Sequence, residues 1–150
     1  MHYAHDAYLE SRVMTAGPID LIRLLYQAGM GEVREARTQL AEGNIEARVK
    51  HISKACAILV ELAGSLDHER GGEVSLRLVS LYDYMLRKLV EANIRKSDAI
   101  LAEVLGLMAT LLEAWDGVKA QTQPEQPAEN QWMPSMGEPE TAHSSNAWSF

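Results

Sequence analysis

Four long segments of this chain repeat apolar residues every three or four positions, and this period constrains the fold more than any other feature. Such spacing places the apolar side chains on one face of an α-helix. Residues typical of turns and helix caps separate the segments, namely Gly17-Pro18, Gly43-Asn44, 67–72 and Ser97. We therefore predict a loop over 67–72 and helices over 18–42, 45–66, 73–95 and 98–119.

Each predicted helix carries an apolar stripe that would face a shared core. The stripes comprise Ile22, Leu25, Tyr26, Gly29, Val33, Ala36 and Leu40; Ile45, Val49, Ile52, Cys56, Leu59, Ala63 and Leu66; Val74, Leu78, Leu81, Met85, Leu89 and Ala92; and Leu101, Val104, Met108, Leu111, Trp115 and Val118. Short connections between long amphipathic helices are typical of antiparallel bundles. The predicted fold class is therefore all-α, an antiparallel four-helix bundle.

The composition divides the chain into a body and a tail. Residues 120–150 contain four of the five prolines and neither Lys nor Arg, a composition typical of disorder. Residues 1–16 lack a helical period, and we expect them to form an irregular lead-in to the bundle. The predicted domain therefore covers 1–119, and 120–150 is predicted to be a disordered tail.

The charge distribution excludes several classes of partner. Residues 1–119 carry a net charge of −3 and residues 120–150 a net charge of −4, without a basic stripe. Nucleic acid and anionic membrane surfaces are therefore not expected partners. No apolar run approaches the ~20 residues that span a bilayer, and the N-terminus lacks the plan of a signal peptide. We expect a cytoplasmic protein without membrane insertion.

The helices carry more apolar residues than a bundle stripe of about 100° can bury. On helical wheels the surplus residues are Leu21, Leu24, Val79, Leu86, Val90, Leu105 and Leu112. One interpretation is the scattered exposure of ordinary proteins. The other is a set of surface grooves that accept amphipathic helices from a partner, with Tyr3 and Tyr8 of the lead-in as a removable cover. Both interpretations remain open from the residues alone.

Motifs for catalysis or for metal and phosphate binding are absent from the sequence, so no cofactor is expected. One fragment, His51-Ile52-Ser53-Lys54, is similar to part of a histidine phosphotransfer motif, which also occurs on four-helix bundles. The glycine usual after that lysine is Ala55 here. We interpret the fragment as part of a solvated helix face, and we expect no enzyme.

An ordered series of short motifs resembles the FliS family, the bacterial flagellar export chaperones for flagellin. The resemblance covers about residues 3–119. Its motifs are Thr15-Ala16-Gly17-Pro18, Leu24-Leu25-Tyr26, Glu69-Arg70-Gly71-Gly72-Glu73, Leu81-Tyr82-Asp83-Tyr84-Met85 and Glu91-Ala92-Asn93-Ile94. The chain departs from the family pattern at Gly17, where a serine is usual, and at Gln27-Ala28-Gly29, where Asp-Gly is usual.

The resemblance implies an antiparallel bundle that binds the disordered C-terminal segment of flagellin along its surface. Binding would prevent premature polymerisation and keep flagellin competent for export. The resemblance, combined with the wheel positions, predicts partner-binding residues Tyr3, Tyr8, Leu21, Leu24, Val79, Tyr84, Leu86, Val90, Asn93, Leu105 and Leu112. Other flagellar export or regulatory proteins are possible partners. The alternatives are histidine phosphotransfer through His51 and a regulatory adaptor for another helical client.

Overall fold

The computed structural model describes the backbone of residues 17–122 and the side chains as far as Val118. Within this range the chain forms four helices: α2 (Pro18–Glu42), α3 (Ile45–Gly64), α4 (His68–Arg95) and α5 (Asp98–Thr122). The predicted all-α class is confirmed. Helix α5 continues to Thr122, past the predicted start of the tail at 120. The lead-in 1–16 and the rest of the predicted tail lie outside the described residues.

Local capping explains where α2 ends and where α3 and α5 begin. Gly43 closes α2 in a left-handed conformation (φ 76°, ψ 16°), which glycine adopts without a steric penalty. Asn44 caps α3, because its side-chain oxygen accepts a hydrogen bond from the N–H of Ala47 at 3.1 Å. Ser97 caps α5 in the same way, accepting from the N–H of Ile100 at 3.2 Å. The predicted boundaries at 43–44 and at Ser97 are confirmed.

The prediction of a loop over 67–72 was wrong, because most of this segment forms the first turn of α4. The Asp67 carboxylate caps that turn by accepting hydrogen bonds from two backbone N–H groups, each at 3.2 Å. Gly72 then kinks the helix with φ 53° and ψ −126°, a conformation that side-chain-bearing residues rarely adopt. Across the kink, Ser75 Oγ and His68 Nδ1 form a hydrogen bond of 2.7 Å, which ties the turn to the rest of α4.

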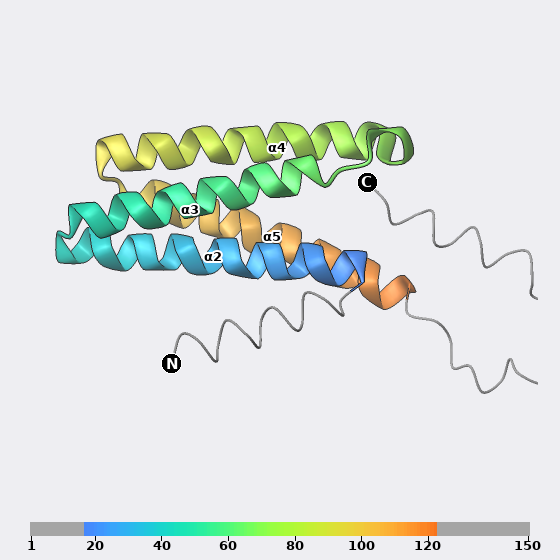
Figure 1. Cartoon of the computed structure of the whole chain (residues 1–150), viewed down its shortest axis with the longest axis horizontal. Helices are drawn as coiled ribbons and strands as arrows, with labels where there is room; N and C mark the ends of the chain where they lie inside the picture. Colours follow the sequence, from blue (N-terminus) through green and yellow to red (C-terminus); the bar gives the residue numbers. More distant parts are fainter. Residues whose placement is uncertain (1–16, 123–150) are drawn as a thin grey trace, which may run out of the picture.

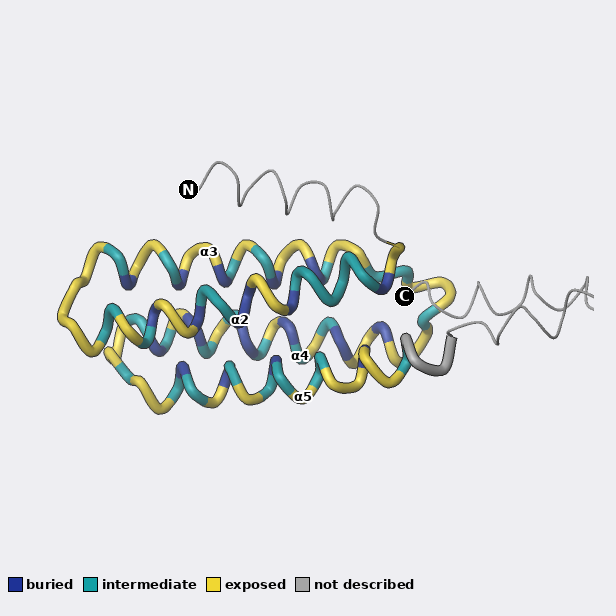
Figure 2. The backbone as a smooth tube through the Cα atoms, turned by 90° about the horizontal axis from the view of Figure 1, so that it is seen from below, coloured by how far each residue is buried: buried dark blue, intermediate teal, exposed yellow. Residues whose placement is uncertain are grey.

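The helices form a ring in which consecutive helices run in opposite directions (Figure 1). Helix α2 packs against α3 and α5, and α4 packs against the same two helices on the other side. All four helices contribute buried residues to one core, and in Figure 2 the buried positions of α3 and α5 lie on the sides that face the middle of the bundle. The arrangement is an antiparallel four-helix bundle with four outer edges, each between two neighbouring helices.

The core is a single cluster of apolar side chains from all four helices. Its buried members are Tyr26, Met30, Val33, Ala36, Ile52, Ala55, Leu59, Leu62, Leu78, Tyr82, Met85, Leu89, Ala92, Leu101, Val104, Met108 and Trp115. Gly29 allows close packing here, because a Cβ at this position would lie 2.6 Å from Met108 Cε and 3.2 Å from Ile58 Cγ2. The glycine is therefore a packing residue of the core.

Two tyrosines join the diagonal helices α2 and α4 through the centre of the bundle. The hydroxyl groups of Tyr26 and Tyr82 are 2.6 Å apart, and both side chains are almost completely buried. Burial raises the pKa of both phenols, so both remain neutral at physiological pH. A hydrogen bond between two neutral hydroxyls satisfies polar groups that would otherwise be costly in the core.

Two of the predicted core stripes are rotated relative to the observed core. In α3 the buried side includes Arg48, Ala55 and Leu62, whereas Ile45 and Val49 of the predicted stripe are exposed. The predicted stripe of α3 lies about 50° from the observed one, at ~100° per residue. In α4, Ser75 and Tyr82 are buried where Val74 and Leu81 were predicted. The polar contacts of these buried side chains fix the rotation of the two helices. The spacing of apolar residues in the sequence does not reveal such contacts.

Candidate functional site

Each of the four edges of the bundle carries at least one polar contact between its two helices. The contacts are Glu32 with His51 for α2 and α3, Arg48 with Asn93 for α3 and α4, Tyr84 with Glu103 for α4 and α5, and the pairs Arg23–Asp116 and Arg37–Asp98 for α2 and α5. These contacts identify which side of each helix faces which neighbour. They therefore allow surface residues to be assigned to edges.

The edge between α3 and α4 carries an apolar strip. We define the α3/α4 strip by its residues, which are Ile45, Val49, Cys56 and Val60 of α3 and Val79, Leu86, Val90 and Ile94 of α4. On α3 these positions lie on the opposite side from His51 and Ile58, which contact α2. On α4 they lie on the opposite side from Tyr84, which contacts α5.

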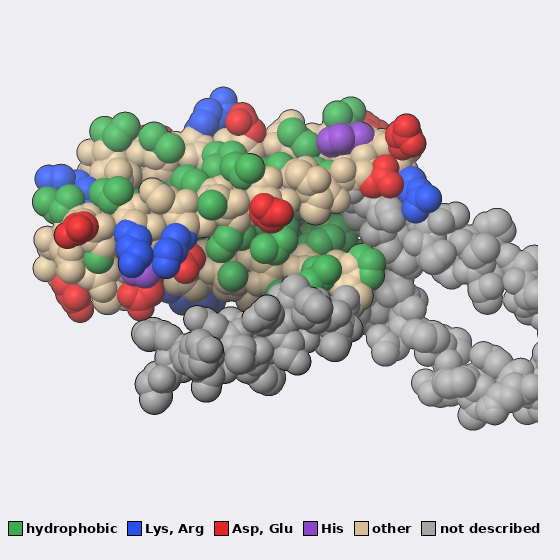
Figure 3. All heavy atoms as spheres, viewed as in Figure 1, with side chains coloured by type: hydrophobic (Ala, Val, Ile, Leu, Met, Phe, Trp, Pro, Cys, Tyr) green, Lys and Arg blue, Asp and Glu red, His purple; other side chains and the backbone are tan. Residues whose placement is uncertain are grey.

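The strip holds most of the strongly exposed hydrophobic residues in the described part of the chain. Five of the seven large hydrophobic side chains that are exposed there belong to it: Ile45 (57%), Val49 (39%), Val60 (58%), Val90 (52%) and Ile94 (73%). Figure 3 shows hydrophobic side chains gathered over α3 and α4 on this face, with charged groups between them. Clustered exposed apolar side chains, unlike scattered ones, mark interaction surfaces.

The strip brings together three of the predicted partner-binding residues, and Asn93 lies on the same edge at the end of the strip. Val79, Leu86 and Val90 lie on it, with Val79 and Leu86 only partly exposed. Leu105 and Leu112 are on the side of α5 that carries Asp98 and Asp116, so they face the α2 edge. Leu21 and Leu24 are on the outer side of α2, and Tyr3 and Tyr8 lie outside the described residues. The structure thus distributes the predicted set over several edges.

Tyr84 and Asn93 each make a contact between helices. The Tyr84 hydroxyl donates to the Glu103 carboxylate, and this hydrogen bond raises the pKa of the Tyr84 phenol. Asn93 Oδ1 accepts a hydrogen bond from Arg48 Nε at 3.0 Å. Both side chains are partly exposed and remain available to a partner on one side.

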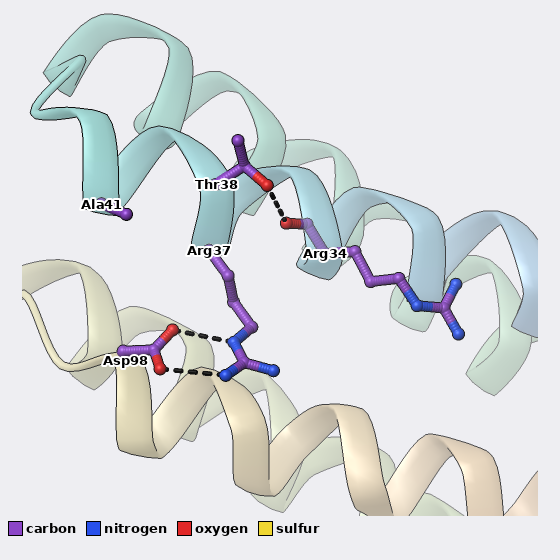
Figure 4. A pocket seen from close by; sticks show the side chains of 5 residues that line it. All are labelled: Arg34, Arg37, Thr38, Ala41 and Asp98. Atoms are coloured by element: carbon purple, nitrogen blue, oxygen red, sulfur yellow. Dashed lines mark hydrogen bonds and ion pairs between the residues drawn. The ribbon is translucent and has the colours of Figure 1, made fainter.

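An open pocket of about 410 Å³ lies between α2 and the start of α5 (Figure 4). The Arg37 guanidinium holds both oxygens of Asp98, at 2.8 and 3.0 Å, and this pair lowers the pKa of the Asp98 carboxyl. Arg34 extends along α2, away from that pair. Within the described residues no group of three or more His, Cys, Asp or Glu is placed to hold a metal ion. The polar groups of the pocket therefore form an ion pair that joins α2 to α5.

Comparison with known proteins identifies the family. The family described as "Flagellar protein FliS" matches residues 1–122. The chain belongs to the FliS family. It is 40% identical over 108 residues to the flagellar secretion chaperone FliS of Salmonella typhimurium, a match that covers 71% of this chain and 80% of that protein.

Two further members of the FliS family agree with this assignment. The chain is 38% identical over 110 residues to the flagellar secretion chaperone FliSB of Pseudomonas aeruginosa, covering 73% of the chain and 87% of that protein. It is 34% identical over 111 residues to the flagellar secretion chaperone FliS of Bacillus subtilis, covering 74% and 82%. The family resemblance inferred from the sequence motifs is confirmed.

His51 takes part in a polar contact between α2 and α3 in this FliS-family chain. Its Nδ1 atom lies 2.7 Å from a carboxylate oxygen of Glu32, and the two side chains are about three-quarters buried. The contact gives His51 a structural role at the edge between α2 and α3. Burial raises the pKa of the Cys56 thiol, so this thiol is protonated at physiological pH.

Sequence reasoning missed four of the five exposed strip residues of this FliS-family chain: Ile45, Val49, Val60 and Ile94. Two of them, Ile45 and Val49, were assigned to the core stripe of α3, and the rotation of that helix turns them outward. Arg48, which takes an inward position, was also missed because a charged residue is normally placed at the surface. The available signal was the polar residue Asn93 beside Val90 and Ile94, because its amide can accept a hydrogen bond from a donor on the facing helix.

No helix within residues 17–122 is long and apolar enough to cross a membrane.

Proposed function

We propose that this chain is an export chaperone that binds the disordered C-terminal segment of flagellin along the α3/α4 strip. The observation that carries the proposal is the clustering of half-exposed Val and Ile side chains on one edge of a FliS-family bundle. The relatives named above are flagellar secretion chaperones, which supports a role in binding rather than catalysis.

The exposed apolar area of the strip limits the binding free energy that one client helix can gain there. Burying the exposed half of one Val or Ile side chain contributes about 1 kcal/mol, so the five most exposed strip residues together contribute about 5 kcal/mol. Ordering a disordered segment costs about 2–5 kcal/mol or more. One helix on this strip would therefore bind weakly. A tightly held client must also cover a second edge, for which Leu105 and Leu112 on α5 are the predicted candidates.

Covering the client's apolar residues would prevent flagellin from polymerising before export. An assembly segment that is apolar associates with copies of itself when it is left bare. Such a chaperone would act in the cytoplasm, where flagellin is made and kept ready for export. Other flagellar export or regulatory proteins would be alternative clients of the same strip.

A calorimetric titration of the full chain with the C-terminal segment of flagellin from the same organism tests the proposal. We expect saturable binding with a negative heat-capacity change, the mark of buried apolar surface. Hydrogen exchange should slow along α3 and α4. A scrambled segment of identical composition is the control. Equal binding of both peptides, or none, would refute flagellin as the client, and capture of a different helical protein on the same strip would indicate a regulatory adaptor.

A further inference from the structure

Arg48 is a cation buried at one end of the α3/α4 strip. Only 7% of the residue is exposed, and its Nε donates a hydrogen bond to Asn93 Oδ1 at 3.0 Å. The ion pairs found among residues 17–118 involve other arginines, so no carboxylate of that part of the chain neutralises Arg48. A nearly buried guanidinium held by a neutral amide alone has unused capacity for an anion.

The terminal nitrogens of Arg48 keep part of that capacity at the surface. In the described part of the chain, every side-chain nitrogen or oxygen that is fully buried has a hydrogen-bond partner. The hydrogen bond to Asn93 uses Nε, which leaves the N–H groups on Nη1 and Nη2. These atoms therefore retain accessible surface, from which they can donate to a bound group.

The surroundings of this guanidinium are apolar. Ile45 and Val49 flank Arg48 along α3, and Val90 and Ile94 flank Asn93 along α4. These four side chains are between 39% and 73% exposed. The strip therefore combines a set of apolar contacts with one buried positive charge at its end.

The free chain stabilises this charge only in part. Asn93 lies in the last turn of α4, where unpaired carbonyl groups give the helix end a partial negative charge. Arg48 also lies in the first turn of α3, where the helix end is partly positive. The two helix ends therefore have opposite effects on the Arg48 charge. A full negative charge from a partner would stabilise this cation more than the partial charge of a helix end does.

We propose that Arg48 recognises an Asp or Glu side chain on the apolar face of the bound client helix. This inference rests on the proposed function and specifies which segments the strip accepts. A client helix would place small or branched apolar residues against Ile45, Val49, Val90 and Ile94, and a carboxylate against the guanidinium. An apolar helix without that carboxylate would cover the Arg48 N–H groups without replacing their water, which costs affinity.

The test uses two charge-removing variants of the full chain. Arg48→Met replaces the buried cation by a side chain of similar length, and such replacements are tolerated in protein interiors. Arg77→Met is the matched control, because Arg77 is 76% exposed on α4, on the side that carries Tyr84 and faces α5. Both variants change the net charge equally. Urea unfolding of each variant establishes that the fold is retained.

Each chain is titrated with the C-terminal flagellin segment, amidated at its end so that only side-chain carboxylates remain. We expect Arg48→Met to weaken binding about 10- to 100-fold, the effect of losing a hydrogen bond to a charged group. Arg77→Met should change affinity less than about 2-fold. Replacing one client Asp or Glu by its amide should cause the same loss with the unmodified chain, and no further loss with Arg48→Met.

The outcomes separate this inference from the proposed function. Binding that is indifferent to Arg48, or losses from the two partners that simply add, overturns the recognition of a carboxylate and leaves the chaperone role standing. Failure of the unmodified chain to bind the segment overturns both. The amide substitutions in the client do not depend on how Arg48→Met folds, so they decide the question even if that variant is unstable.

Discussion

Replacing Val90 by Asp should impair client binding while leaving the fold largely intact. Val90 is 52% exposed in the free chain and is absent from the side chains that pack on the core in the described residues. Full burial of a valine contributes about 2 kcal/mol, so the half that remains exposed accounts for about 1 kcal/mol of client binding. An aspartate facing an apolar client adds a desolvation cost of about 1–3 kcal/mol.

The expected loss of affinity is therefore about 30- to 1000-fold, measured by calorimetric titration with the flagellin segment. The loss of folding stability should stay near 1 kcal/mol, measured by urea unfolding, because half of the side chain is already in water. Val74→Asp is a matched control. Val74 is 51% exposed on the same helix but lies on the side that faces α5. Similar losses of affinity from both substitutions would refute the assignment of the binding surface to the α3/α4 strip.

Four further single substitutions and one double variant test the core and the Arg37–Asp98 ion pair. Tyr26→Phe should cost about 1–3 kcal/mol in urea unfolding, because it leaves the buried Tyr82 hydroxyl without its phenolic partner, and the double Phe variant should recover part of the loss. Gly29→Ala should destabilise by about 1–3 kcal/mol through overpacking, whereas Gly31→Ala, with open space around its Cβ, should stabilise by up to about 1 kcal/mol in the same assay. The pKa of the Asp98 carboxyl is lower in the folded chain than in the unfolded chain. The ionised carboxylate therefore stabilises the fold above about pH 4, and this contribution is lost as the pH falls through the folded-state pKa. The thermal midpoints of Asp98→Asn and the unmodified chain should differ at about pH 6 and converge near pH 2.

The sequence specified the helices because their ends depend on local chemistry. Gly43, Asn44 and Ser97 act through their own backbone conformation or a hydrogen bond three residues away, and such signals are visible in a linear pattern. The first turn of α4 was missed because Gly71-Gly72 indicates a loop in the sequence. One of these glycines instead supplies a kink inside the helix.

The rotation of the helices could not be predicted in the same way. Ile45 and Val49 fit an apolar stripe as well as Ala55 and Leu62 do, and a bundle buries only one of these sets. Contacts between distant residues decide which set is buried, and here Arg48 with Asn93 is such a contact. The candidate site was therefore predicted at Val79, Leu86 and Val90 on α4, and missed on α3.

The diagonal tyrosine pair has a consequence for how such a chaperone would load and unload. The pair joins helices that are not neighbours in the ring, so separating the α2/α3 hairpin from the α4/α5 hairpin breaks it. An opening of that kind would expose two phenols and much of the core at once, which makes it a global unfolding event rather than a gating motion. The bundle would thus act as a fixed surface for the client and would not open and close around it. The rate of dissociation would then depend on how fast the client helix leaves the surface. The bundle, unchanged by this step, could bind the next subunit.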